Sequence, residues 1–148
     1  MKYSLADYIL NIQSNDPDIA AILTGNSGLS IGGEGSALES INIKIDNELF
    51  STTSYATGGW VHEKNLARNG TIDVTLNQLS KNVAKFKQLC NMYYGKDYAS
   101  LTITLVDSEA NEIARCEDCF IKAIPVQDFK GTSSTQTWSL TAGKITFN

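Results

Sequence analysis

Strict alternation of apolar and polar side chains is the feature that most constrains how this chain can fold. Three segments show it: 41–46 (INIKID), 71–76 (TIDVTL) and 99–106 (ASLTITLV). Successive side chains of a β-strand point to opposite faces, so these segments are predicted to be strands with one buried and one solvated face. Solvation of one face is typical of antiparallel sheets.

Weaker patterns extend the predicted sheet to six to eight strands. Further strands are expected at 19–23, 60–66, 113–124 and 134–147. Asn47-Glu48 is predicted to be a tight turn, after which 49–55 returns as the second arm of a hairpin. Asn69-Gly70 carries another hairpin-turn signal. The type of the element at 3–13 stays open, because its apolar residues fit both helical and strand spacing.

The spacing of apolar residues changes after residue 76, and one α-helix is predicted at about 80–94. Its apolar stripe repeats with helical spacing and consists of Leu79, Val83, Phe86, Cys90 and Tyr93, widened by Leu89. Residues at this spacing share one face of a helix. Ile72, Val74 and Leu76 are expected to form a core with Val83 and Phe86. The helix would then flank the sheet.

Glycine marks the longest predicted loop, at 24–40, which holds five of the eleven glycines. Glycine at this density disfavours regular structure. The chain of 148 residues suits one domain, 1–148, in which 1–18 is a possible N-terminal extension. The predicted fold class is mainly β (α+β): an antiparallel β-sandwich or half-barrel with one flanking α-helix and a long Gly-rich loop.

Charge and hydropathy exclude several classes of protein. The net charge of −4 disfavours a nucleic-acid groove, which needs clustered Lys and Arg. No apolar run approaches the length of a membrane span, so no membrane anchor is expected. Asp7 interrupts the apolar stretch near the start, which argues against a signal peptide. Three cysteines disfavour a closed disulfide framework, and synthesis in a reducing cytoplasm is expected.

No combination of residues assembles into an active site, so the chain is predicted not to be an enzyme and to use no cofactor. Cys116 and Cys119 form a CxxC motif inside a predicted strand, where regular geometry would point them to opposite faces. A small thiol or metal module using these two cysteines remains an alternative. His62 is the single histidine, and it lacks the HExxH context. The glycine segment lacks the lysine of a phosphate-binding loop.

The predicted helix is acid-free and carries Lys81, Lys85 and Lys87, with Lys96 just beyond it. Two interpretations stay open. The lysines form an ordinary solvated face, or they bind an acidic surface on another chain. The second interpretation is favoured by the mild repulsion of like charges at i and i+4.

Two segments together resemble the tail-tube family of contractile-tailed bacteriophages. They are the strand GTIDVTL at 70–76 leading into the helix, and WSLTAGKI at 138–145. The resemblance implies a structural virion protein, synthesised in the host cytoplasm, whose six subunits form a ring with one continuous barrel around the lumen. Rings would stack into a tube through which DNA is ejected without specific binding. Sheath, baseplate and tape-measure proteins would be its partners.

The resemblance also implies that a long hairpin or loop reaches the adjacent subunit or ring. We assign this role first to 47–59 and second to 24–40, and expect the helix lysines away from the DNA. The expected contact residues are Asn47, Glu48, Ser51, Thr52, Thr53, Ser54, Tyr55, Gly32, Gly33, Gly35, Lys81 and Lys85. Within the same family, the alternatives are a tube-initiator or baseplate-hub component, or a secreted-tube protein of a related injection system.

Overall fold

The computed structural model describes residues 2–23, 28–33, 35–95 and 100–148. In these ranges the chain forms nine strands, two α-helices and one short 3-10 helix. In chain order the elements are η1 (Leu5–Asp7), β1 (Ile9–Gln13), α1 (Pro17–Ile22), β2 (Leu29–Gly32), β3 (Leu38–Ile45), β4 (Phe50–Ser54), β5 (Trp60–Lys64), β6 (Gly70–Asn77), α2 (Lys81–Gly95), β7 (Leu101–Val106), β8 (Glu112–Ile121) and β9 (Thr135–Phe147).

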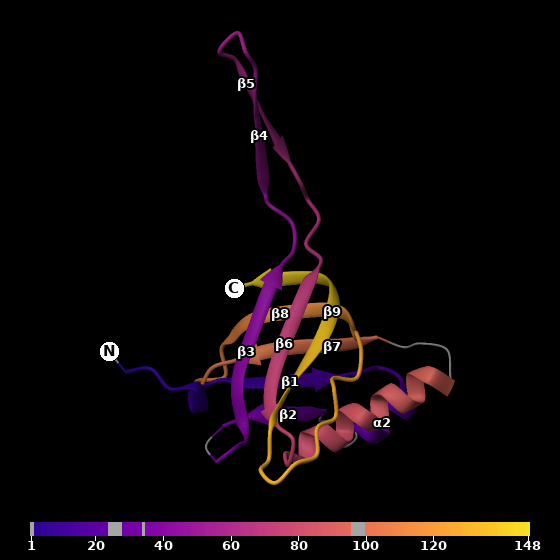
Figure 1. Cartoon of the computed structure of the whole chain (residues 1–148). Helices are drawn as coiled ribbons and strands as arrows, with labels where there is room; N and C mark the ends of the chain where they lie inside the picture. The colour runs from indigo at the N-terminus through magenta and orange to yellow at the C-terminus, as the bar shows by residue number, and fades with distance from the viewer. Residues whose placement is uncertain (1, 24–27, 34, 96–99) are drawn as a thin grey trace.

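Seven of the strands form one antiparallel sheet in the order β2-β1-β7-β8-β9-β6-β3. The sheet curls into a half-barrel, and α2 lies across its lower right side in Figure 1. The remaining pair, β4 and β5, stands apart as a hairpin. The predicted fold class is therefore confirmed: a mostly β half-barrel with one main helix.

The core lies between the concave face of the sheet and α2. Ile72, Val74 and Leu76 are buried with Val83 and Phe86, as the alternation and the helical stripe predicted. Phe86 stacks on the fully buried Trp138 of β9 with 5.2 Å between ring centroids. Aromatic pairs of this kind contribute about 0.5–1.5 kcal/mol beyond the area they bury. This stack ties the helix to the middle of the sheet.

One residue of the predicted helical stripe was placed wrongly. Leu79 lies before the first residue of α2 and is 78% exposed. The side-chain oxygen of Asn77 accepts the backbone N–H of Leu79 at 2.9 Å, so the chain turns here before it becomes helical. An Asx turn of this kind competes with helix formation.

The strand predicted at 19–23 is wrong, because most of this segment belongs to helix α1. Asp16 caps the helix through its carboxylate, which accepts the backbone N–H groups of Asp18 at 2.9 Å and Ile19 at 3.3 Å. Pro17 occupies the first helical position, where its missing N–H costs nothing. The cap and the proline therefore outweigh the short apolar run.

The segment 24–40, predicted to be a loop, contains the whole of β2 and the start of β3. Leu29 and Ile31 of β2 are buried, and the strand pairs with β1. A Cβ atom at Gly32 would lie 2.5 Å from the carbonyl oxygen of Tyr8, so this glycine is required for close backbone approach. Residues 24–27 and 34 lie outside the described residues.

Residues 1–18, expected as an N-terminal extension, contribute an inner strand to the sheet. β1 lies between β2 and β7 and pairs with both. Leu10 and Ile12 on this strand are fully buried. The apolar alternation of the segment is that of a core strand.

The hairpin predicted between 41–46 and 49–55 is also wrong. β3 pairs with β6, placing Ile43 opposite Ile72, whereas β4 pairs with β5. Apolar side chains on β3 and β6 bury together, while the Ser/Thr-rich β4 has little to bury. Asn69-Gly70 is not a hairpin turn either: the side chain of Asn69 accepts a 2.7 Å hydrogen bond from that of Asn47 where the chain leaves the sheet and returns.

Replacing Gly70 by alanine tests the close packing of β3, β6 and β9. The new Cβ atom would collide with the carbonyl oxygen of Lys44 and approach Ile145 Cδ1 at 2.5 Å. We expect Gly70→Ala to lower the free energy of unfolding by about 1–3 kcal/mol, measured by thermal or chemical denaturation. Gly131→Ala is the control, because a Cβ atom there meets nothing within 4 Å. Equal stability of the two variants would contradict this packing.

Candidate assembly surfaces

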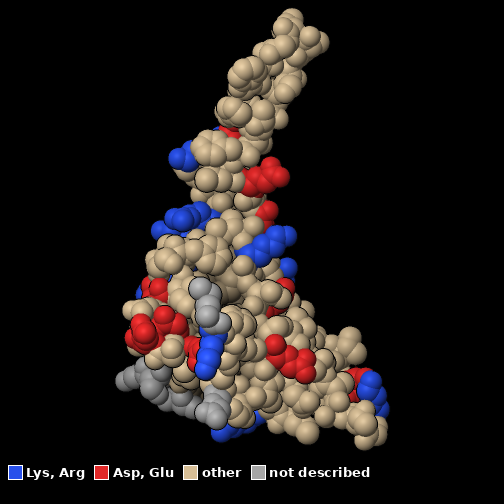
Figure 2. Space-filling model, turned by 90° about the vertical axis from the view of Figure 1, so that its left-hand side faces the viewer, with Lys and Arg blue, Asp and Glu red and all other residues tan. Residues whose placement is uncertain are grey.

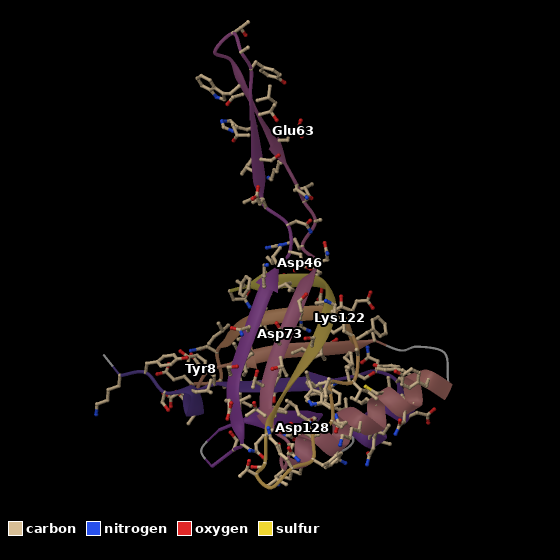
Figure 3. All side chains as sticks on the ribbon, viewed as in Figure 1. Tyr8, Asp46, Glu63, Asp73, Lys122 and Asp128 are labelled. Atoms are coloured by element: carbon tan, nitrogen blue, oxygen red, sulfur yellow. The ribbon has the colours of Figure 1, made fainter. Side chains whose placement is uncertain are left out.

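A projecting arm, residues 46–69, is the most prominent feature outside the half-barrel. It leaves the sheet at the end of β3, carries β4 and β5, and returns at the start of β6 (Figure 1). Every residue of β4 and β5 is exposed. Across the hairpin, Thr52 Oγ1 and His62 Nδ1 lie 2.8 Å apart. In Figure 3, Asp46 marks the base of the arm, and Glu63 lies farther out.

The outer part of the arm is uncharged and exposes several large apolar side chains. The sequence from Leu49 to His62 contains no Lys, Arg, Asp or Glu, and Figure 2 shows an outer arm free of charged side chains. Its exposed large apolar residues are Leu49, Phe50, Tyr55, Trp60, Val61 and Leu66. Exposed apolar surface of this extent marks interaction sites, and an isolated two-stranded hairpin is marginally stable in water.

The structure divides the expected contact residues into two groups at opposite ends of the molecule. Seven lie on the arm: Asn47, Glu48, Ser51, Thr52, Thr53, Ser54 and Tyr55. Gly32, Gly35 and Lys81 line one open pocket of about 450 Å³ beside the start of β3, far from the arm. Gly33 follows β2 next to this pocket, and Lys85 lies one helical turn beyond Lys81.

Of the large apolar residues on the arm, sequence reasoning selected only Tyr55 as a contact candidate. Its other choices on the arm were polar, whereas Phe50 and Trp60 expose 55% and 65% of their surface. The signal that could have found them was the absence of charge across a long stretch flanked by turn residues.

The convex face of β6 and β9 is polar and rich in hydroxyl groups. Thr75 and Thr137 bond across the two strands at 3.0 Å, and Ser139 donates to the Asp73 carboxylate at 2.6 Å. Asp73 is the only residue with a formal charge on β6. A Lys or Arg cluster of the kind that binds phosphates is absent from these two strands.

The half-barrel also has two open edges. β2 pairs only with β1, and β3 only with β6, over the residues that the structure describes. β3 is eight residues long. A long unpaired edge offers backbone donors and acceptors to another strand.

The cysteines differ from the geometry that the sequence predicted. Cys116 and Cys119 do not point to opposite faces; both are buried. Asp118 has a φ of 57°, and the alternation breaks at this residue, opposite Gly143. A Cβ atom on Gly143 would lie 3.3 Å from Asp118 Cβ, so a glycine suits the break in the strand.

The thiols are held in their neutral form. Burial raises the pKa of Cys116 to about 11. Burial, with smaller effects from Cys116 and Asp118, raises the pKa of Cys119 to about 12. Metal ligation and nucleophilic attack both need the thiolate. Across the described ranges, no group of three or more His, Cys, Asp or Glu side chains is placed to hold a metal ion.

The fold is shared with proteins of contractile injection systems. The anti-feeding prophage cap, a tube-terminating cap, superposes with a TM-score of 0.55 at 13% identity, covering 100% of this chain and 93% of the other. A chain of an extracellular contractile injection system, the PVC sheath-tube complex in the extended state, gives 0.53 at 10% identity, with 99% and 91% covered. The PVC sheath/tube terminator gives 0.53 at 11%, with 100% and 97% covered.

The sequence itself identifies the family. Residues 15–148 match the family model described as bacteriophage PhiTE tail tube protein. The chain belongs to this phage tail tube family. A search of curated proteins finds no match. No described helix is both long enough and apolar enough to span a membrane.

Limited proteolysis of the unassembled subunit tests the autonomy of the arm. Chymotrypsin is expected to cut beside Tyr55 or Trp60 before it cuts any strand of the half-barrel, because the arm has no core of its own and opens locally. Mass spectrometry of the fragments identifies the order of cleavage. First cuts inside any strand of the half-barrel would contradict this description.

Alkylation kinetics test the state of the cysteines. In native protein at pH 8, Cys116 and Cys119 are expected to react with iodoacetamide at least ~100-fold more slowly than in denaturant, since both burial and a raised pKa suppress attack. Peptide mapping reads each thiol separately. Fast native labelling of either one would instead support the thiol-module alternative.

Proposed function

We propose that this protein is a structural subunit of a phage tail tube, in which six copies form a ring and stacked rings form the conduit for DNA ejection. The observation that carries the proposal is membership of the tail tube family over residues 15–148. The projecting arm and the two open sheet edges support it, because each is a surface that a neighbouring copy can cover.

Ring formation would use the open edges. Pairing β3 of one copy with the sheet of the next would satisfy its free backbone groups and join the half-barrels into one continuous barrel. Such a contact joins two different surfaces of the same chain, and it gives a closed ring when the rotation between copies closes.

The polar face of β6 and β9 suits the lumen. Its opposite face is buried in the core, so a sheet that lines the conduit presents this one. Hydroxyl groups predominate, and the formal charges are only Asp73 on β6 and Lys144 on β9, so DNA would meet no cluster of cations that binds its phosphates. α2 packs on the buried side of the sheet, against Trp138, which would place Lys81 and Lys85 away from the DNA.

The arm would join one ring to the next. Its charge-free outer part exposes Phe50 and Trp60, whose burial against a second ring would remove apolar surface from water. The sheath would surround this tube in the virion, the baseplate would lie at its end, and the tape-measure protein would occupy the lumen before DNA.

A position at one end of the tube is the second candidate. Two of the similar structures come from a tube-terminating cap and a sheath/tube terminator. Tube-initiator, baseplate-hub and secreted-tube roles use the same fold and differ in which ring surface meets another protein. Locating the chain in an intact particle separates these positions.

Deleting the arm tests the proposal. A variant in which 49–65 is replaced by a short Gly-Ser linker should keep its half-barrel, because every residue of β4 and β5 is exposed. Circular dichroism checks the fold. Negative-stain microscopy should show tubes of even calibre for the wild type and none for the variant. Tubes of normal length from the variant would contradict the role of the arm. A wild type that stays monomeric at high concentration would contradict the function itself.

A further inference from the structure

The lysines of α2 form no ion pair with any acid that the structure describes. Lys81, Lys85 and Lys87 belong to the helix, and no Asp or Glu occurs from Val74 to Lys96. No ion pair connects these three ammonium groups to an acid within the described residues. Lys81 and Lys85 are spaced i and i+4, where like charges mildly destabilise a helix.

No ion pair joins the acids at the start of the neighbouring helix to these lysines. α1 packs against α2, carries Asp18 in its first turn and is preceded by Asp16. Asp16 is engaged as the cap of α1, since its carboxylate accepts the backbone N–H groups of Asp18 and Ile19. The lysine face of α2, formed by Lys81 and Lys85 one helical turn apart, therefore has no acidic partner among the described residues of its own copy.

A complementary acidic surface lies at the other side of the half-barrel. The turn between β7 and β8 carries Asp107, Glu109 and Glu112. The Asp107 carboxylate shapes the turn by accepting the backbone N–H groups of Glu109 at 3.0 Å and Asn111 at 2.9 Å. Glu112 pairs with Arg115 at 3.0 Å. Glu109 is exposed and has no ion pair among the described residues.

The two surfaces face different directions. In Figure 1 the β7–β8 turn lies at the left end of the sheet, whereas α2 extends to the right. One copy therefore cannot join its own acidic turn to its own lysine face. Two copies placed side by side can.

We propose that the β7–β8 turn of one copy docks against the lysine face of α2 in the next copy around the ring. The inference rests on the proposed ring and names residues of its lateral contact. A contact between two different surfaces of one chain repeats around a ring until it closes. Copies with a net charge of −4 repel one another, and this pairing places opposite charges where the copies meet. The same contact sets the orientation of the copies, because the turn of each copy always meets α2 of the next.

Charge reversal on each side tests the contact. The helix variant is Lys81→Glu/Lys85→Glu and the turn variant is Glu109→Lys/Glu112→Lys. Lys2→Glu/Lys130→Glu is the control for the helix variant, with the same change in net charge at two other exposed sites. Circular dichroism checks folding, and light scattering with negative-stain microscopy gives the lowest concentration at which rings or tubes form.

Each reversed variant alone should need at least about a tenfold higher concentration to assemble, because like charges would then face each other across the contact. The control should assemble as wild type does. An equimolar mixture of the helix and turn variants should assemble near the wild-type concentration, since both kinds of contact in an alternating ring are again complementary. The wild-type threshold should rise with salt, which screens exposed charges.

Three outcomes overturn the inference: assembly of the helix variant at the wild-type concentration, a defect in the helix variant with none in the turn variant, or two defects that mixing does not rescue. The second outcome would assign the lysine face to a different acidic partner. Failure of the wild type to form rings or tubes would instead refute the proposed function, so the two failures are distinguishable.

Discussion

The burial of only one face of a single curved sheet is the constraint on which the rest of the structure depends. Trp138 and the apolar residues of six other strands face inward, and Phe86 of α2 closes over them through a stack at 5.2 Å. Since a strand alternates its side chains, the opposite face must be polar, and Thr75, Thr137 and Ser139 occupy it. Core, helix position and a solvated outer face all follow from this one-sided packing.

One-sided packing also leaves parts of the chain without an intramolecular partner. The arm is too far from the core to bury Phe50 or Trp60, and the edges of β2 and β3 keep unpaired backbone groups. A protein that worked as a monomer would carry these features as aggregation hazards. Under the function proposed here they would be the surfaces by which copies assemble. The unbalanced lysines of α2 and the exposed Glu109 belong to the same pattern.

Elements with a regular repeat of apolar residues could be predicted from the sequence. Elements in which two local signals favour different structures could not. Alternation located β6, β7 and most of β3, and the helical stripe located α2, with Val83 and Phe86 on its buried side. The strand predicted at 19–23 failed because a capping Asp16 and Pro17 decided the local structure. β2 was missed because Gly32 in it and Gly28 just before it serve close backbone contacts. Which strands pair with each other could not be predicted from local sequence patterns, since pairing depends on which apolar faces can bury together. For the candidate site, sequence reasoning located the arm but selected only Tyr55 among its exposed large apolar side chains.

A cryo-electron microscopy reconstruction of the assembled protein tests the central claim most directly. The account predicts rings of six in which β3 pairs edge to edge with a neighbouring sheet, the convex face of β6 and β9 lines the lumen, and the arm contacts the next ring. An assembly with α2 lining the lumen, or with the arm extended into solvent between rings, would contradict it.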